Sequence, residues 1–155
     1  MQTVALIVAA GKGERFGSAV PKQYACLGGI PILTRSIRAF VEHPWIDAVR
    51  VVIGEDDHER YAAATRGMAL LEPAIGGATR QATVRTGLES LAALAPERVL
   101  IHDAARPLVS SEPGAERGHA AQPRPRLGCV VVAALNRATE GSTRCRALRA
   151  GRCAR

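Results

Sequence analysis

The amino-acid sequence predicts an α/β fold with a mainly parallel sheet. Short, mainly apolar runs at 4–8, 49–53 and 99–101 are typical of strands that are buried on both faces of such a sheet. Patterns of helical period lie between them, at 32–41 and 84–94. Strands that alternate with helices are joined by crossover connections, and these connections produce parallel strand pairs.

The first half of the chain gives the clearer pattern. A strand at 4–8 is followed by a helix that carries Ile32, Leu33, Ile37, Phe40 and Val41. That helix should stop at His43-Pro44, because the residue before a proline disfavours the helical conformation. After the strand at 49–53, Asp56-Asp57 offers a helix start, and an alanine-rich helix is expected over 59–66.

The second half is less regular. We expect a third strand at 68–71 and a fourth at 98–102. Between them lies a helix that ends at Pro96 and has apolar residues on one face: Val84, Leu88, Leu91 and Leu94. The apolar run 128–135 is compatible with one more strand, whereas 136–155 has neither helical nor strand spacing.

The length and charge of the chain limit the kinds of domain and binding partner that can be expected. The chain has 155 residues, which suits one modest domain with its own core. Its net charge is +7, but residues 110–155 hold nine arginines against three glutamates, and residues 1–109 are close to neutral. The basicity therefore belongs to the tail and does not mark the folded part as a nucleic-acid-binding surface. We expect no nucleic-acid partner.

Neither a membrane nor a metal–thiolate site is expected. No apolar run is long enough to cross a bilayer, and the first residues lack the cationic segment of a signal peptide. A cytoplasmic protein follows. The four cysteines show no Cys-x-x-Cys or Cys/His spacing, so free thiols are the expectation.

A glycine-rich stretch follows the first strand directly. Residues 9–17 read Ala-Ala-Gly-Lys-Gly-Glu-Arg-Phe-Gly, and Pro21-Lys22-Gln23 comes soon after. Glycines allow close approach to a phosphate, backbone N–H groups point at its oxygens, and Arg15 and Lys22 supply positive charge. The spacing fits neither a Walker A loop nor a dinucleotide fingerprint. An ordinary strand-to-helix turn is the alternative interpretation.

Two more polar clusters follow predicted strands. The first, 76–84, pairs Gly76-Gly77 with the hydroxyls of Thr79 and Thr83, and a plain helix cap by Thr79 is the alternative to ligand binding. The second is His102-Asp103-Ala104-Ala105-Arg106-Pro107. An Asp just past a buried strand is a usual magnesium ligand, although a structural Asp103–Arg106 pair is equally compatible. His102 is expected to be a packed strand residue. Ligands bind at the carboxyl ends of parallel strands, where all three clusters lie.

Together these motifs resemble the 2-C-methyl-D-erythritol 4-phosphate cytidylyltransferase family. The resemblance rests on Ala9-Ala10-Gly11-x-Gly13-x-Arg15, Pro21-Lys22-Gln23-Tyr24, Gly76-Gly77-x-x-Arg80-x-x-Thr83-Val84 and the 102–107 block. It runs from about residue 3 to residue 109. The sequence Gly-Gly-Ala-Thr-Arg-Gln that begins at Gly76 is closer to that of the bifunctional enzyme of this family, whose second domain is a cyclodiphosphate synthase.

The resemblance implies a Rossmann-like nucleotidyltransferase sheet that transfers CMP from CTP to a sugar-alcohol phosphate and releases pyrophosphate. Arg15 and Lys22 would stabilise charge on the α-phosphate, and Asp103 would bind Mg²⁺. The implied nucleotide-binding residues are Ala9, Ala10, Gly11, Gly13, Gly77, Thr83 and Ala104. The family also dimerises through an arm segment, which is not recognisable in this chain.

The tail sets a limit on these expectations. Residues 1–109 form the expected nucleotide-binding part, and 110–155 form an atypical Arg/Ala/Gly/Pro-rich tail that we expect to be poorly ordered. The family's later Asp-Thr-x-Lys segment and substrate lysine have no match there, so no role passes to Thr139. Our hypothesis is that the tail is translated out of frame. A non-catalytic fragment that at most binds CTP and Mg²⁺ is therefore the alternative to an active cytidylyltransferase.

Overall fold

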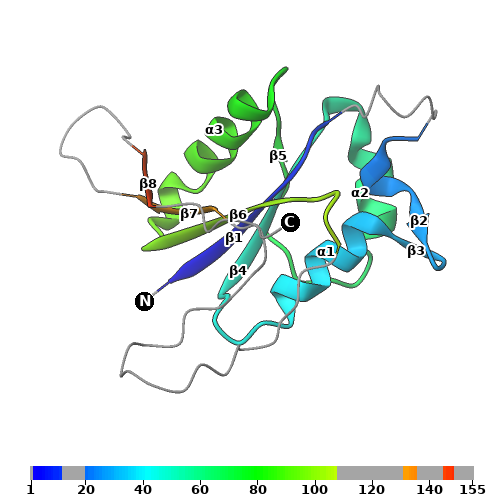
Figure 1. Cartoon of the computed structure of the whole chain (residues 1–155), viewed down its shortest axis with the longest axis horizontal. Helices are drawn as coiled ribbons and strands as arrows, with labels where there is room; N and C mark the ends of the chain where they lie inside the picture. Colours follow the sequence, from blue (N-terminus) through cyan, green and yellow to red (C-terminus); the bar gives the residue numbers. More distant parts are fainter. Residues whose placement is uncertain (1, 12–19, 108–130, 136–144, 149–155) are drawn as a thin grey trace, which may run out of the picture.

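A central sheet of six strands organises the protein (Figure 1). The computed structural model describes residues 2–11, 20–107, 131–135 and 145–148. β1 (Thr3–Ala9) lies between β4 (Ala48–Ile53) and β6 (Arg98–Asp103) and pairs in parallel with both. The strand order is β5-β4-β1-β6-β7-β8. The mainly parallel α/β fold that the sequence predicts is confirmed.

The third parallel strand differs from the expected one. A strand at 68–71 is wrong, because β5 (Ala74–Ile75) is the segment that pairs with β4. The Leu71 amide already donates to the Val49 carbonyl at 2.9 Å, but Pro73 has no N–H with which to continue the ladder. Regular pairing therefore begins immediately after the proline.

The other side of the sheet is antiparallel. β7 (Val131–Leu135) pairs with β6, and β8 (Cys145–Leu148) pairs with β7. The apolar run that ends at Leu135 is thus a strand, as expected. The prediction that 136–155 contains no strand is wrong for 145–148, which form β8. Four residues of sequence Cys-Arg-Ala-Leu are too few for an alternation to stand out from its surroundings.

Helices cover both faces of the sheet (Figure 1). α1 (Ile32–Val41) and α2 (His58–Ala64) lie on one face, and α3 (Arg80–Ser90) lies on the other. Because successive strand residues point to opposite faces, β1 supplies both cores. The α1 side buries Ala5, Ile7, Leu33, Ile37 and Phe40, and the α3 side buries Val4, Leu6, Leu88 and Leu91.

The helix predictions are confirmed apart from their ends. α3 packs so close to the sheet that a Cβ at Gly87 would lie 2.8 Å from side-chain carbons of both Leu6 and Val52. The apolar pattern predicted up to Leu94 continues beyond α3 as the short helix η4 (Ala92–Leu94).

The start of α2 differs from a capped one. Asp57 closes η3 (Glu55–Asp57) and precedes α2, but its side chain pairs with Arg60 at 3.0 Å instead of capping the helix. No helix within the described residues is both long and apolar enough to span a membrane.

A small hairpin not expected from the sequence precedes α1. β2 (Cys26–Leu27) pairs antiparallel with β3 (Ile30–Pro31). The two turn residues are Gly28 and Gly29, with φ of +60° and +77°, a conformation that suits glycine in a two-residue hairpin. Arg35 of α1 donates two hydrogen bonds to the Leu27 carbonyl, at 3.0 and 2.7 Å, and so attaches the hairpin to the helix.

Candidate functional site

The carboxyl ends of β1, β4 and β6 meet at one edge of the sheet. In the strand register Ala9 lies opposite Ile53, and Val8 lies opposite Asp103. The Ala104 amide donates to the Val8 carbonyl at 3.0 Å, so the chain beyond β6 stays beside β1. The motifs that follow β1 and β6 therefore share this edge, as parallel strands require.

Close backbone contact brings the second motif to the same edge. The Gly76 amide donates to the Ile53 carbonyl at 2.8 Å. A Cβ at Gly76 would lie 2.4 Å from Cβ of Ala10 and 2.9 Å from Cγ2 of Thr83, closer than such atoms approach in proteins. Glycine is thus required at position 76, and the contact joins the first motif to the second.

Two threonines organise the start of α3. The Thr79 hydroxyl accepts a hydrogen bond from the Ala82 amide at 3.1 Å, which makes Thr79 the N-cap. Thr83 is buried, and its hydroxyl lies 3.1 Å from the Gly77 carbonyl and 2.9 Å from the Thr79 carbonyl. The helix-cap interpretation is correct for Thr79. The contact of Gly77 and Thr83 with cytidine stays a prediction, and in the structure the Thr83 hydroxyl stabilises the turn at Gly77.

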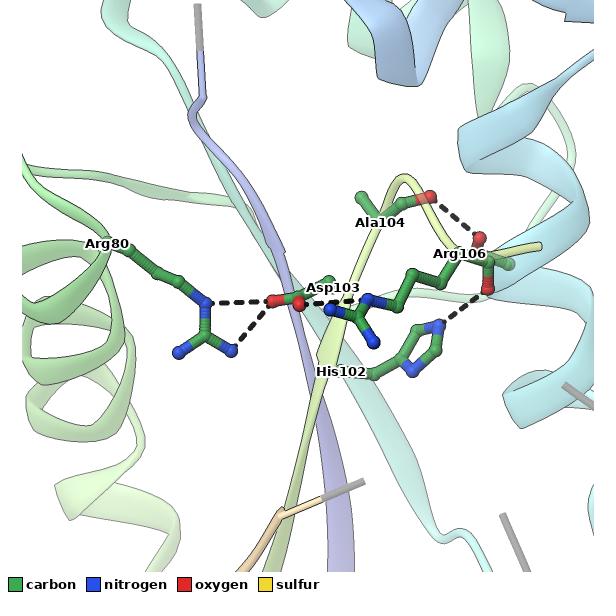
Figure 2. Close-up of polar contacts among 6 residues, drawn as sticks. Arg80, His102, Asp103, Ala104 and Arg106 are labelled. Atoms are coloured by element: carbon green, nitrogen blue, oxygen red, sulfur yellow. Dashed lines mark hydrogen bonds and ion pairs between the residues drawn. The ribbon is translucent and has the colours of Figure 1, made fainter. Parts of the chain in front are cut away.

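Asp103 lies at the end of β6 between two guanidinium groups (Figure 2). Arg80, the first residue of α3, donates to Oδ1 from Nε at 3.0 Å and from Nη2 at 2.7 Å. Nε of Arg106 lies 3.2 Å from Oδ2. The Asp103–Arg106 pair that the sequence offers as a structural alternative is therefore present. The Arg80 bonds connect the second motif to the third.

Buried polar groups fix the turn after β6. The Ser36 hydroxyl of α1 donates to the Ala104 carbonyl at 2.7 Å. Nε2 of His102 lies 2.9 Å from the Arg106 carbonyl (Figure 2). Burial lowers the pKa of His102, so the ring is neutral and we assign its proton to Nε2, where it can be donated. The ring also packs against Phe40, with centroids 5.0 Å apart. His102 is a packed strand residue, as expected.

Lys22 begins η2 (Lys22–Tyr24) and is exposed. The next residue, Gln23, is buried, and its amide nitrogen donates to the Ala9 carbonyl at 2.6 Å and to the Gly11 carbonyl at 2.9 Å. The turn that carries Lys22 is thus bonded to the chain at the end of β1. Two further predicted site residues, Gly13 and Arg15, lie outside the described residues.

Asp103 is the candidate metal ligand. No group of three or more His, Cys, Asp or Glu side chains that could hold a metal occurs within the ranges described above. Mg²⁺ commonly takes one or two carboxylates and completes its coordination with substrate phosphates and waters. The Asp103 side chain is 28% exposed at this edge, so it fits an ion that arrives together with a phosphate ligand. Arg80 would then have to release Oδ1.

Sequence reasoning assigned no role to Arg80, Gln23 or Ser36. A signal for Arg80 existed, because a cation at the first position of a helix is unfavourable for the helix dipole and indicates another partner. Gln23 belongs to the motif Pro21-Lys22-Gln23-Tyr24, but the motif alone does not indicate its hydrogen-bond partners. Ser36 lies on the buried side of α1, where a hydroxyl indicates only an unspecified buried partner.

Comparison with known proteins identifies the same family that the sequence motifs resemble. The family model of 2-C-methyl-D-erythritol 4-phosphate cytidylyltransferase matches residues 3–140. The match runs past residue 109, where the resemblance seen in the sequence ends, and includes β7. A bifunctional enzyme IspD/IspF from Paramagnetospirillum magneticum is 54% identical over 108 residues, which are 70% of this chain and 28% of that relative.

Solved structures show the same fold. The 4-diphosphocytidyl-2C-methyl-D-erythritol synthase of Anaerococcus prevotii matches with a TM-score of 0.57 and 28% identity, over 70% of this chain and 46% of that one. The 2-C-methyl-D-erythritol 4-phosphate cytidylyltransferase of Thermus thermophilus matches with a TM-score of 0.53 and 32% identity, over 71% and 44%. The aligned part of this chain thus spans less than half of each of these relatives. Since the family model covers most of its length, the chain belongs to the 2-C-methyl-D-erythritol 4-phosphate cytidylyltransferase family.

Proposed function

We propose that this chain carries the nucleotide-binding part of an enzyme that transfers CMP from CTP to 2-C-methyl-D-erythritol 4-phosphate. The observation that supports the proposal most is the convergence of three motifs at one sheet edge. The backbone at Gly76 lies against Ala10, and Arg80 bonds to Asp103. Family membership and the names of the relatives point to the same reaction.

The triphosphate would lie along Ala9, Ala10 and Gly11. Among the described residues, a Cβ at Gly11 would have no atom within 4 Å, which leaves the backbone on this side open to a bulky anion. Backbone N–H groups in such a turn are natural phosphate ligands. The nucleoside would lie toward Gly77 and Thr83, where α3 begins, and Ala104 would line the edge beside Asp103.

The proposed reaction needs positioning and charge rather than a protein nucleophile. A phosphate oxygen of the acceptor forms a bond to the α-phosphorus of CTP. The bond from that phosphorus to the bridging β-phosphate oxygen breaks, and pyrophosphate leaves with the electron pair. Lys22 and Arg15 would stabilise the negative charge on the α-phosphate oxygens while both bonds are partly formed.

Asp103 would hold a magnesium ion together with the triphosphate. When bound, the ion would neutralise phosphate charge and orient the leaving pyrophosphate. Arg80 and Arg106 would hold the carboxylate in place before the ligand arrives. Their side chains are 60% and 54% exposed, and ion pairs of this kind contribute only about 0–1 kcal/mol, so Asp103 can exchange a guanidinium for a metal.

Binding without turnover is the second candidate function. The aligned part of the chain spans 28% of a bifunctional relative and 46% of a solved synthase, and the acceptor-binding motifs of the family are not recognisable in 110–155. The motifs that converge at the sheet edge are those expected to contact CTP. A chain with this edge and no acceptor site would bind CTP and release no pyrophosphate.

Pyrophosphate release from CTP and the acceptor, with Mg²⁺ present, separates the two candidates. Release that Lys22→Ala reduces by about 100- to 1,000-fold would support transfer. Arg85→Ala is the matched control, because it removes an exposed cation of α3 that pairs with Glu89. A CTP-dependent rise in melting temperature without release would support binding alone. If none of the four nucleoside triphosphates raises the melting temperature and no pyrophosphate forms, both candidates are wrong.

A further inference from the structure

We propose that Gln23 is a positioning residue: its buried amide fixes the turn that carries Lys22 against the end of β1. The functional part of this inference rests on the role proposed above for Lys22. Its structural part concerns the described residues alone. It rests on the two hydrogen bonds donated by the Gln23 side chain and on the burial of the neighbouring Tyr24.

Both N–H groups of the Gln23 amide are used. A primary amide nitrogen has two donors, and this one lies 2.6 Å from the Ala9 carbonyl and 2.9 Å from the Gly11 carbonyl. The Gln23 residue is 4% exposed, so water cannot replace these bonds without opening the structure. One side chain thus binds the last residue of β1 and the second residue beyond it.

The turn around Gln23 is stiff enough to transmit this attachment to Lys22. The Tyr24 amide donates to the Pro21 carbonyl at 2.9 Å, and the Ala25 amide donates to the Lys22 carbonyl at 3.2 Å. Tyr24 is buried in the α1-side core. The Lys22 backbone therefore cannot shift relative to the end of β1 unless the Gln23 bonds break or the Tyr24 ring leaves its place.

Glutamine suits this position better than its close relatives. A glutamate would place carboxylate oxygen against two carbonyl oxygens and supply no donor. An asparagine keeps the amide but is one methylene shorter. Because a misplacement of about 1 Å can cost roughly 100-fold in rate, a fixed distance between Lys22 and the strand end matters for any ligand that both must contact.

The structural part is tested without a ligand. Gln23→Met keeps the length of the side chain and removes both donors. Thr34→Val is the control, since it removes another buried hydrogen-bond donor, the hydroxyl that donates to the Ala64 carbonyl at 2.6 Å. Amide hydrogen exchange compares Tyr24 and Ala25 with the core amides of β1.

In Gln23→Met we expect Tyr24 and Ala25 to exchange at least about tenfold faster, beyond any change in the β1 amides. Thr34→Val should change the amides of η2 no more than those of β1. An equal change in both regions for Gln23→Met would mean that Gln23 contributes only to global stability, and the proposal would be wrong. Should Gln23→Met not fold, Gln23→Asn serves for the same comparison.

The functional part is tested by a double-mutant cycle on the affinity for CTP with Mg²⁺. If Gln23 acts through Lys22, Gln23→Met should weaken CTP binding about tenfold in the parent and less than about twofold in Lys22→Ala. Equal weakening in both backgrounds would overturn the coupling. A parent protein that binds no CTP would overturn the proposed function, whereas the exchange comparison would still decide whether Gln23 fixes the turn.

Discussion

The contact between Gly76 and Ala10 gives the sharpest test of how the site is assembled. In Gly76→Ala the new methyl group would lie 2.4 Å from Cβ of Ala10 and 2.9 Å from Cγ2 of Thr83. Both neighbours are short side chains without a flexible end that could move aside. The backbone of one segment must therefore shift, and the edge of the sheet opens where the first two motifs meet.

The size of the effect follows from two opposing contributions. Forcing an extra methyl group into a packed site typically costs about 1–3 kcal/mol. Replacing glycine by alanine also restricts the unfolded chain, which stabilises the folded state by about 0.4–1 kcal/mol where the backbone allows it. Gly76 is not among the glycines with positive φ, so the backbone allows alanine. We expect a net loss of about 1–2 kcal/mol in the free energy of unfolding.

Gly11→Ala is the matched control, because no atom of the described residues crowds its methyl group. The new Cβ would meet none of these atoms within 4 Å, and φ at Gly11 is not positive, so we expect no loss of stability and a gain of up to about 1 kcal/mol. Urea unfolding of both variants measures the difference. Ala10→Gly in the Gly76→Ala background should restore part of the loss, because it removes the nearest atom. If Gly76→Ala unfolds at the same urea concentration as the parent, the close approach of the two motifs is refuted.

Three further predictions concern the surroundings of this edge. Ser36→Ala removes the buried donor to the Ala104 carbonyl and should lower the free energy of unfolding by about 1–3 kcal/mol, measured in urea. Burial raises the pKa of Tyr24, whose hydroxyl has no partner among the described residues, so the folded state keeps its proton while the unfolded state loses it above pH 10. The free energy of unfolding should therefore fall as the pH rises above about 10. Tyr24→Phe should reduce this fall without destabilising the protein at pH 7. Thermal unfolding of both proteins at pH 7 and above pH 10 measures the difference. Arg80→Ala should change stability by less than about 1 kcal/mol but lower the Mg²⁺ concentration needed for half-maximal stabilisation by CTP; an unchanged or higher Mg²⁺ requirement would contradict the competition for Asp103.

The sequence predicts those parts of the fold that are long and regular. The run at 4–8 and the helical spacing at 32–41 repeat over enough residues to identify β1 and α1. β5 and β8 have two and four residues, so their pairing comes from neighbouring strands rather than from their own pattern. The hairpin at Gly28-Gly29 was open to prediction, since two glycines between short apolar segments indicate a tight turn.

The candidate site also has a part that the sequence predicts and a part that it does not. Asp103 and Lys22 belong to motifs whose composition already indicates phosphate chemistry, and the structure brings their backbones to one edge. The sequence does not show which residues these motifs pair with, although Arg80 itself belongs to one of the quoted motifs. Arg80 lies 23 residues before Asp103, and Ser36 lies 68 residues before Ala104. Such pairs depend on strand order and on which helix covers which face, and neither follows from local pattern.

The contacts that assemble this edge bear on the choice between the two proposed functions, transfer and binding alone. Each strand end accepts a hydrogen bond from the motif beside it: the Val8 carbonyl from the Ala104 amide, the Ile53 carbonyl from the Gly76 amide, and the Ala9 carbonyl from the Gln23 side chain. Every one of these contacts lies within residues 2–107. These contacts therefore depend on the parallel register of β1, β4 and β6. We propose that the CTP site rests on this register, whereas transfer would also need groups that hold the acceptor.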